Sequence, residues 1–462
     1  MKSYELKPNY DNLLKTYLED TIGRNNDIFR FVSMLNAIDA NCSIALDGNW
    51  GNGKTFFVKQ IKMFLDANND FITPNHEEDI MNIKNHSKKY FGKQEINFQP
   101  QVCVYYDAWE NDNDDDPVLS LIYSILINAT SDFSIQNDTG LIKKATSILE
   151  FFTGKNWSDL IENLKKDSPF EEMAKYKNIE NQIKEFLDSL LLEKGNRLIV
   201  FVDELDRCKP SYAVRLLERI KHYFGNDRIT FVFSVNINEL QHTVKRHYGD
   251  EFNACRYLDR FFDLQISLPP ADKSRFYQSI DFENSQYTFD IVCGAVIDTY
   301  NFSLREITKY IRLTKIAAFE PTHDSRKYDF SFSEGRTKQF CLLYIIPVMI
   351  GIKIYDSDKY NAFISGKNNV PLIEVSNCLK DHFFDELLNR TETYNEEDKD
   401  RTLTTIEAKL GEVYEALFVK EYSGNNYQTQ IGQYSFNSSI KEMLFRTTSM
   451  LSDYANFEIE CK

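Results

Sequence analysis

Apolar residues follow two patterns along this chain. Five short stretches have the composition of strands, and they occupy residues 43–47, 101–107, 197–203, 229–235 and 263–268. The three longest of them are largely apolar, as in strands that are covered on both faces of a sheet. Elsewhere apolar residues recur every three or four positions, which predicts amphipathic helices. Buried strands that alternate with helices predict an α/β fold.

Helical spacing begins near the start of the chain. Residues 5–40 predict two helices separated by a turn at Gly23–Arg24, with Asn26 or Asp27 as the N-cap of the second. Residues 66–100 are polar and poorly periodic, so we expect surface excursions there. Further helices are expected within 118–196 and over the remainder of the chain after residue 272, where Ser303 is a candidate cap.

The first strand runs directly into the sequence GNWGNGKT and then into a helical pattern. In this strand–loop–helix context the motif G-x-x-x-x-G-K-T predicts a phosphate-binding loop. Its glycines let backbone N–H groups surround an anion, and the helix adds its positive end. The residues expected to contact the nucleotide are Gly48, Asn49, Trp50, Gly51, Asn52, Gly53, Lys54, Thr55 and Phe56.

Four side chains have predicted roles in the chemistry of ATP and Mg²⁺. Lys54 is expected to face solvent in the empty site and to place its ammonium between the β- and γ-phosphates. Thr55 is expected to join the coordination of Mg²⁺. The strand at 197–203 ends in Asp203, a candidate to hold Mg²⁺ directly or through water, and Glu204 follows as the candidate to polarise the attacking water.

Neighbouring polar residues allow more than one interpretation. Asp206 and Arg207 are adjacent and of opposite charge, so a structural ion pair between them is the default. At the end of the next strand, Ser234 or Asn236 is a candidate contact for the γ-phosphate or the water, and Asn236 is equally suited to cap the following helix. The acidic run at 111–117 predicts a solvated loop and helix N-cap, because it lacks the ligand spacing of a calcium loop.

Composition narrows the class of protein. A net charge of −16 over 462 residues opposes contact with nucleic acid or anionic membrane except through a local patch. The eight cysteines include no C-x-x-C pair, which favours reduced thiols in a cytoplasmic protein over disulfides or zinc. The most apolar run, 340–352, is too short to span a bilayer and predicts one or two buried helices, so no transmembrane segment is expected.

The assembled motifs resemble the KAP family of P-loop NTPases, within the broader group that includes AAA+ and STAND ATPases. The resemblance rests on GNWGNGKT, VYYDAWEND, LIVFVDELDRCKP, ITFVFSVNINEL, YLDRFFDLQISLPP and SLREITKYIR, which together cover roughly residues 20–320. It implies a five-stranded parallel sheet, with an added strand between the phosphate-loop strand and the acidic strand, and a helical lid. We therefore expect an NTPase core at 1–270 with a helical insertion at about 108–196, a lid at 271–322 and a C-terminal helical domain at 323–462.

Several residue roles follow from the resemblance alone. Arg305 matches a lid arginine that senses the γ-phosphate, although Ser303 and Leu304 replace the family's Asn-Pro. Arg256 or Arg260 is placed to act in trans as an arginine finger, with a buried ion pair as the alternative. A Gly-Arg turn before the phosphate loop often packs against adenine in related ATPases, and a plain turn between helices fits Gly23–Arg24 equally well.

The resemblance also implies a soluble bacterial member, with anti-phage defence as a plausible setting. The leading hypothesis is an ATP-hydrolysing switch that converts nucleotide state into homo-oligomer assembly or effector binding. The second is a scaffold that binds ATP, turns it over little and recruits an effector protein. A nucleic-acid-stimulated motor is a third reading, which the acidic composition does not favour.

Overall fold

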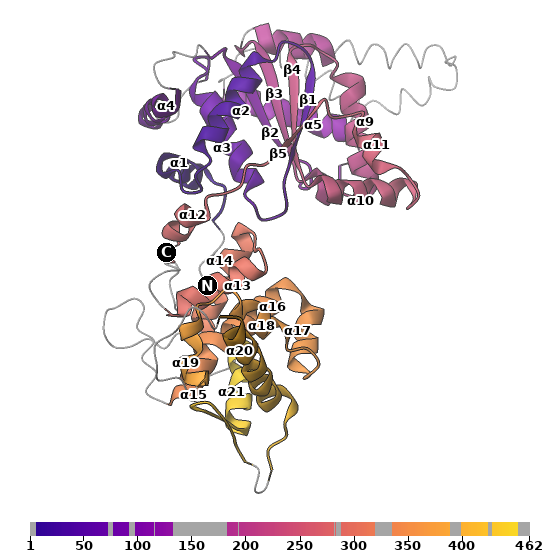
Figure 1. Ribbon diagram of the computed structural model, residues 1–462. Helices are drawn as coiled ribbons and strands as arrows, with labels where there is room; N and C mark the ends of the chain where they lie inside the picture. The colour runs from indigo at the N-terminus through magenta and orange to yellow at the C-terminus, as the bar shows by residue number, and fades with distance from the viewer. Residues whose placement is uncertain are drawn as a thin grey trace. The chain divides into compact units, whose positions relative to one another are not determined.

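The computed structural model describes most of the chain in two compact units, Leu6–Asp272 and Lys273–Lys462 (Figure 1). Each unit has hydrophobic core residues of its own. The described residues are 6–72, 77–91, 98–114, 116–132, 183–192, 194–280, 282, 288–318, 335–388, 399–423 and 427–450.

A five-stranded parallel sheet lies at the centre of the N-terminal unit. Its strands are β1 (Cys42–Asp47), β2 (Gln101–Asp107), β3 (Arg197–Asp203), β4 (Ile229–Val235) and β5 (Leu264–Ser267). They are ordered β2-β3-β4-β1-β5, and all pairings are parallel. β4 thus lies between the phosphate-loop strand and the acidic strand, and the predicted α/β fold with a five-stranded parallel sheet is confirmed.

Helices cover both faces of this sheet, because its central strands are apolar on both sides. One layer contains α1 (Tyr10–Glu19), α2 (Asn25–Ala37), α3 (Lys54–Ala67) and α4 (Glu77–Phe91). The other contains α5 (Pro117–Asp132), the helical residues 183–192, α9 (Pro210–Tyr223) and α10 (Ile237–Tyr248). Within β3, Phe201 packs with the first layer and its neighbours Val200 and Val202 pack with the second.

Local details correct several expectations. α2 begins at Asn25, and Asp20 Oδ1 accepts a 3.1 Å hydrogen bond from its first N–H, so neither Asn26 nor Asp27 is the cap. Residues 77–91 form a helix with Ile83 in the core, where a surface excursion was expected. Asp116 Oδ1 accepts from Val118 N–H at 2.8 Å, as the predicted cap of α5 does. Much of the expected insertion at 108–196 lies outside the described residues.

The described part of the C-terminal unit is mostly helical, with one antiparallel pair of strands that the sequence did not predict. Its helices share one hydrophobic core with Phe436 of that pair, so segments expected as lid (271–322) and as C-terminal domain (323–462) pack together. Ser303 caps α14 in a reciprocal arrangement, because its N–H donates to Glu306 Oε2 at 2.8 Å. The elements are α12 (Lys273–Ser279), α13 (Thr288–Thr299), α14 (Leu304–Ala318), α15 (Arg336–Phe340), η3 (Cys341–Ile345), α16 (Ile346–Tyr355), α17 (Ser357–Ile364), α18 (Val370–Ser376), η4 (Asp381–Phe384), α19 (Asp385–Leu388), α20 (Lys399–Tyr414), η6 (Glu415–Val419), β6 (Thr429–Ile431), β7 (Tyr434–Phe436) and α21 (Ser438–Thr448).

The most apolar helical stretch runs from Arg336 to Tyr355 through α15, η3 and α16. At 20 residues it is longer than expected, and by length and composition alone it would suit a membrane span, but 72% of its most apolar window is buried inside the unit. Pro347 lies just after the π-helical η3, and its carbonyl accepts a 3.1 Å hydrogen bond from Tyr310 OH. The packing is that of a core helix, as predicted.

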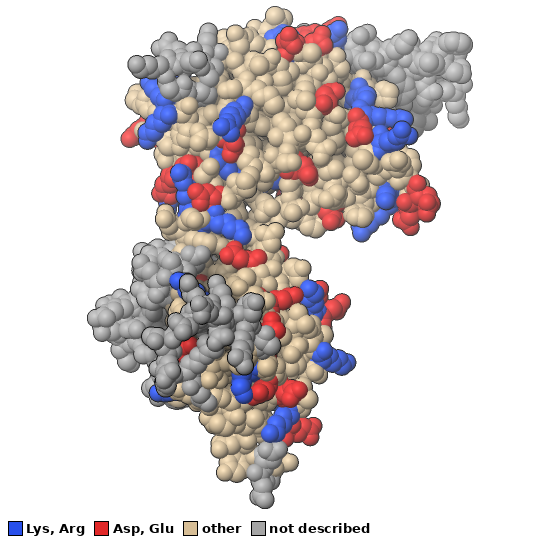
Figure 2. Space-filling view, in the orientation of Figure 1, with Lys and Arg blue, Asp and Glu red and all other residues tan. Residues whose placement is uncertain are grey.

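Charges are interspersed on the face of the molecule drawn in Figure 2. Blue basic and red acidic side chains of the described residues alternate over both units. Among the described residues, this face therefore shows no concentrated basic track of the kind that binds nucleic acid.

Candidate nucleotide site

The phosphate loop joins β1 to α3 at the carboxyl end of the sheet. Gly51 and Gly53 have φ angles of 80° and 82°, which L side chains rarely adopt. Gly48 is restricted for another reason, since a Cβ atom there would lie 3.0 Å from Leu268 Cβ. The back of the loop therefore rests against Leu268, immediately after β5, and glycine is needed at both the bend and the contact.

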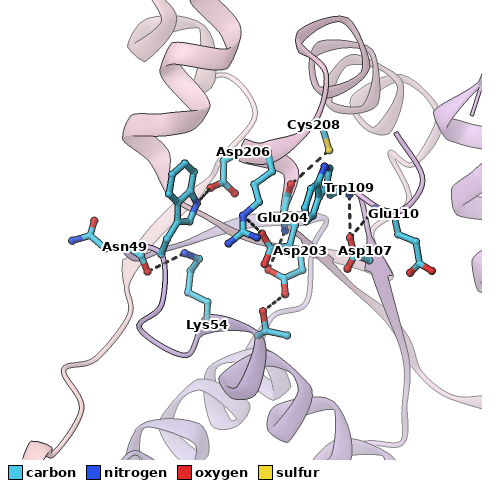
Figure 3. A network of polar contacts seen from close by, with 12 residues as sticks. Asn49, Lys54, Asp107, Trp109, Glu110, Asp203, Glu204, Asp206 and Cys208 are labelled. Atoms are coloured by element: carbon cyan, nitrogen blue, oxygen red, sulfur yellow. Dashed lines mark hydrogen bonds and ion pairs between the residues drawn. The ribbon is translucent and has the colours of Figure 1, made fainter. Parts of the chain in front are cut away.

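Lys54 lies folded against the loop that it follows. Its Nζ donates to Gly48 O at 2.5 Å. It also donates to Asn49 O at 3.3 Å (Figure 3). The residue is only 8% exposed, so the expectation of a solvent-facing lysine was wrong. Burial lowers the pKa of Lys54, while the charges of Asp206, Asp203 and Glu204 oppose that shift.

Thr55 and Asp203 meet where the first turn of α3 faces the end of β3. Thr55 Oγ1 donates to Asp203 Oδ2 at 2.7 Å, and Tyr105 OH donates to the same oxygen at 2.9 Å. Asp203 is 1% exposed, which holds its carboxylate in one orientation. A hydroxyl beside a carboxylate is an all-oxygen donor set, so the residues fit a Mg²⁺ ion bound together with substrate phosphates.

Glu204 follows with a left-handed backbone, at φ 60° and ψ 21°. Its Oε2 forms an ion pair with Arg207 Nε at 2.5 Å. Burial, followed by the nearby charge of Asp203, raises the pKa of Glu204 to about 7, although Arg207 opposes the shift. A carboxyl group whose pKa is raised by burial and by a neighbouring charge is typical of functional sites.

Asp206 and Arg207 do not form the ion pair that was the default interpretation. Asp206 Oδ2 accepts a 2.6 Å hydrogen bond from Trp50 Nε1, and Arg207 pairs with Glu204. The short helix η2 (Leu205–Arg207) accounts for these separate pairings, because it directs the two side chains toward different partners. Asp206 is buried, and burial raises its pKa while the Trp50 hydrogen bond opposes the rise.

The end of β4 places two further polar residues beside this edge. Asn236 caps α10, since its side chain accepts from Glu239 N–H at 3.4 Å; this is one of its two predicted roles. Ser234 is paired in register with Asp203 and is fully buried. Within the described residues its hydroxyl has no hydrogen-bond partner, so it is available to a ligand or a water.

The candidate arginines lie in different parts of the molecule. Arg256, in α11 (Ala254–Leu258), and Arg260 are both exposed, so the alternative of a buried ion pair for them was wrong. Arg305 belongs to α14 of the C-terminal unit, and its action on the γ-phosphate stays a prediction. Phe56, at the start of α3, is half-buried against the core beneath the loop.

One residue of the site, Tyr105, escaped the sequence analysis, and Arg24 was named there only as part of a turn. Tyr105 lies two residues before Asp107 on β2 and therefore on the same face of the strand, and Asp107 is paired in register with Asp203 of β3. The parallel register of β2 and β3 would thus have placed the Tyr105 hydroxyl near Asp203. Arg24 is 2% exposed and donates from Nη1 to Asn52 O at 2.7 Å, which ties the Gly23–Arg24 turn to the phosphate loop. Burial lowers the pKa of Arg24 to about 10.

A glycine-rich loop that leads from a buried parallel strand into a helix, with a threonine and an aspartate in contact at its edge, defines this chain as a P-loop NTPase fold. The model of the KAP family P-loop domain matches residues 24–313. That match covers more than half of the sequence, and the chain belongs to the KAP family.

Other comparisons give more distant similarities. An uncharacterized protein of Methanocaldococcus jannaschii is 36% identical over 77 residues, which are 16% of this chain and 39% of that protein. The chain therefore matches well under half the length of this curated relative. Among solved structures, the Aeropyrum pernix ORC2 protein in its ADPNP–ADP complexes has 12% identity and a TM-score of 0.31, over 96% of this chain and 93% of its own. C. elegans PCH-2 has 10% identity and a TM-score of 0.20, over 80% and 70%.

Proposed function

We propose that this protein is a Mg²⁺-dependent ATP hydrolase that acts as a conformational or assembly switch. The observation that supports it most strongly is the 2.7 Å contact between Thr55 Oγ1 and Asp203 Oδ2, with Glu204 next to Asp203 in sequence. These residues come from two elements far apart in the chain, and together they supply metal ligands and a water-orienting carboxylate.

The reaction assigned to the site is attack of water on the γ-phosphorus, with cleavage of its bond to the β–γ bridging oxygen. Lys54 exchanges the carbonyls of Gly48 and Asn49 for β- and γ-phosphate oxygens, and backbone N–H groups of residues 48–56 surround the phosphates. Thr55 and Asp203 would hold Mg²⁺, which would supply positive charge to the phosphates. Glu204 accepts a hydrogen bond from the water and orients it toward phosphorus.

The switch function requires a partner that responds to the nucleotide state. We assign this part to a second copy of the chain, to an effector protein or to both, with Arg305 acting in cis and Arg260 in trans on the γ-phosphate. A cytoplasmic, bacterial setting in anti-phage defence is the biological context proposed with it. Nucleic acid is not the partner we favour, given the acidic balance of the sequence.

A scaffold that binds ATP with little turnover is the second candidate. The ion pair between Glu204 Oε2 and Arg207 Nε is compatible with it, because the pair occupies one of the two carboxylate oxygens that could accept from water. Both candidates need Lys54 and Asp203 for binding, and only hydrolysis needs Glu204.

Phosphate release under saturating MgATP separates the two candidates. We expect turnover by the wild type, loss of turnover in Glu204→Gln and wild-type turnover in Glu251→Gln, a matched change at an exposed position. ATP binding should persist in Glu204→Gln. Binding without any release by the wild type, alone or at concentrations that allow self-association, would establish the scaffold and reject the hydrolase.

A further inference from the structure

The guanidinium of Arg207 lies between two tryptophans from different parts of the chain. Its central carbon is 5.5 Å from the ring centroid of Trp50 and 5.5 Å from that of Trp109. Trp50 belongs to the phosphate loop, and Trp109 follows β2. A planar, delocalised cation suits this position better than an ammonium does. We call Trp50, Arg207 and Trp109 the tryptophan clamp.

The ring of Trp50 and the backbone of Trp109 are each held by a hydrogen bond. Trp50 Nε1 donates to Asp206 Oδ2 at 2.6 Å, which fixes the indole against η2. Asp107 Oδ1 accepts from Trp109 N–H at 3.1 Å and holds the turn after β2 (Figure 3). The clamp is nevertheless open to solvent, since Trp50 is 43% and Trp109 53% exposed. Such exposed indoles contribute little to the core, so their placement calls for another role.

The third contact of Arg207 leads to the residue assigned to hydrolysis. Arg207 Nε is 2.5 Å from Glu204 Oε2. The backbone of Glu204 is in the left-handed conformation, which sets the direction in which its side chain leaves the chain. With one oxygen engaged, the side-chain torsions of Glu204 are restricted. Within the described part of the chain the pairing uses Oε2, which leaves Oε1 to accept a hydrogen bond from water.

We propose that Arg207 is a positioning residue that orients Glu204 for hydrolysis, and that the tryptophan clamp holds Arg207 in register with the phosphate loop. This inference deepens the proposed hydrolase and rests on it. A nucleotide bound in the phosphate loop lies next to Trp50, which contacts Arg207. The clamp therefore connects nucleotide binding to the position of the Glu204 carboxylate. Misplacement of a positioned group by about 1 Å can cost about 100-fold in rate.

The test compares steady-state hydrolysis by the full-length wild type, Arg207→Gln and Arg207→Lys. We expect Arg207→Gln to lower kcat by about 10- to 100-fold with little change in KM, because the contact acts on the water-orienting group rather than on ATP binding. Arg207→Lys should recover only part of the loss, since lysine keeps the charge without the stacked plane. Arg246→Gln, the same change at an exposed position of α10, should behave as wild type.

Two further variants keep the result interpretable if Arg207→Gln folds poorly. Trp109→Ala removes an exposed ring and should lower kcat, whereas Trp109→Phe should retain most of it. Where Arg207→Gln folds normally, the double variant Arg207→Gln/Glu204→Gln is a separate test: the losses should not multiply, because both changes act on one carboxylate.

Each contrary result has a defined meaning. Unchanged kcat in Arg207→Gln and Trp109→Ala, beside an inactive Glu204→Gln, would overturn the positioning role and leave the hydrolase intact. Losses that multiply in the double variant would also overturn it, since Arg207 would then act elsewhere. Absence of turnover in the wild type would instead overturn the proposed hydrolase and this inference with it.

Discussion

Thr55 Oγ1 and Asp203 Oδ2 lie 2.7 Å apart although 148 positions separate the two residues in sequence. The parallel sheet makes this possible, because β1 and β3 end at the same edge with β4 between them. The fold itself therefore brings the hydroxyl and the carboxylate together.

This relationship predicts a metal-specific defect in Asp203→Asn. The amide keeps an oxygen to accept from Thr55 and Tyr105 but loses the charge that holds Mg²⁺, so MgATP affinity should fall by about tenfold or more while affinity without Mg²⁺ changes little. Titration of a fluorescent ATP analogue, with and without Mg²⁺, measures both. Tyr105→Phe is the matched control, because it removes one hydrogen bond to Asp203 and leaves every proposed metal ligand. Equal affinity of the wild type with and without Mg²⁺ would rule out the assigned role.

Lys54→Ala should weaken ATP binding by at least about tenfold, because a charged hydrogen bond is worth about 1.5–3 kcal/mol. The buried position of Lys54 makes a stability control necessary. Its ammonium bonds only to carbonyls of its own loop among the described residues, so we expect the thermal unfolding temperature to change by a few degrees at most. Lys62→Ala, further along α3, is the comparison variant. Unimpaired turnover in Lys54→Ala would exclude this loop as the catalytic site.

Gly351→Ala tests the helical core of the C-terminal unit. A methyl group at this position would collide with Val296 Cγ1, so the change should lower the free energy of unfolding by about 1–3 kcal/mol. Gly411, in α20, has only an ordinary contact at 3.7 Å, to Asn369 Nδ2. Gly411→Ala should therefore be neutral or stabilising by up to about 1 kcal/mol, as helix propensity dictates. Urea unfolding of the full chain measures both, and equal midpoints would contradict the packing described here.

The arginine assignment makes a prediction about assembly. Arg305→Ala should reduce hydrolysis at every protein concentration, whereas Arg260→Ala should reduce it only where subunits associate, by up to about 10³-fold. Mixing Arg260→Ala with Glu204→Gln subunits should restore some turnover, since each supplies what the other lacks. A monomer that is fully active with Arg260→Ala would leave Arg260 without a role in trans.

The sequence predicted the sheet well because its central strands are apolar on both faces, and the exposed edge strand β5 is closed by a pair of prolines. It missed α4 because Glu77–Phe91 has few apolar residues, although the acidic first turn and the lysines of its last turn carry the charge pattern of a helix. The N-cap of α2 was missed for a different reason. Asp20 supplies that bond from five residues upstream, beyond the reach of a local rule.

Within the site, single motifs were easier to predict than contacts between them. Adjacency in sequence suggested that Arg207 pairs with Asp206, but η2 sends Arg207 to Glu204 and Asp206 to Trp50. The exposure of Lys54 was likewise misjudged, because its flexible side chain folds back onto the carbonyls of Gly48 and Asn49. Such choices depend on the three-dimensional positions of acceptors, which periodicity does not encode.

The close approach of Gly48 to Leu268 links the backbone of the phosphate loop to the segment that leaves the sheet after β5. Leu268 lies just before the prolines that carry the chain out of the sheet, and the N-terminal unit ends at Asp272. Because Gly48 has no side chain, the backbone of the loop packs closely against Leu268 and little free space remains between them. A methyl group at position 48 would therefore press on Leu268, so Gly48→Ala is expected to displace either the phosphate loop or the residues that follow β5.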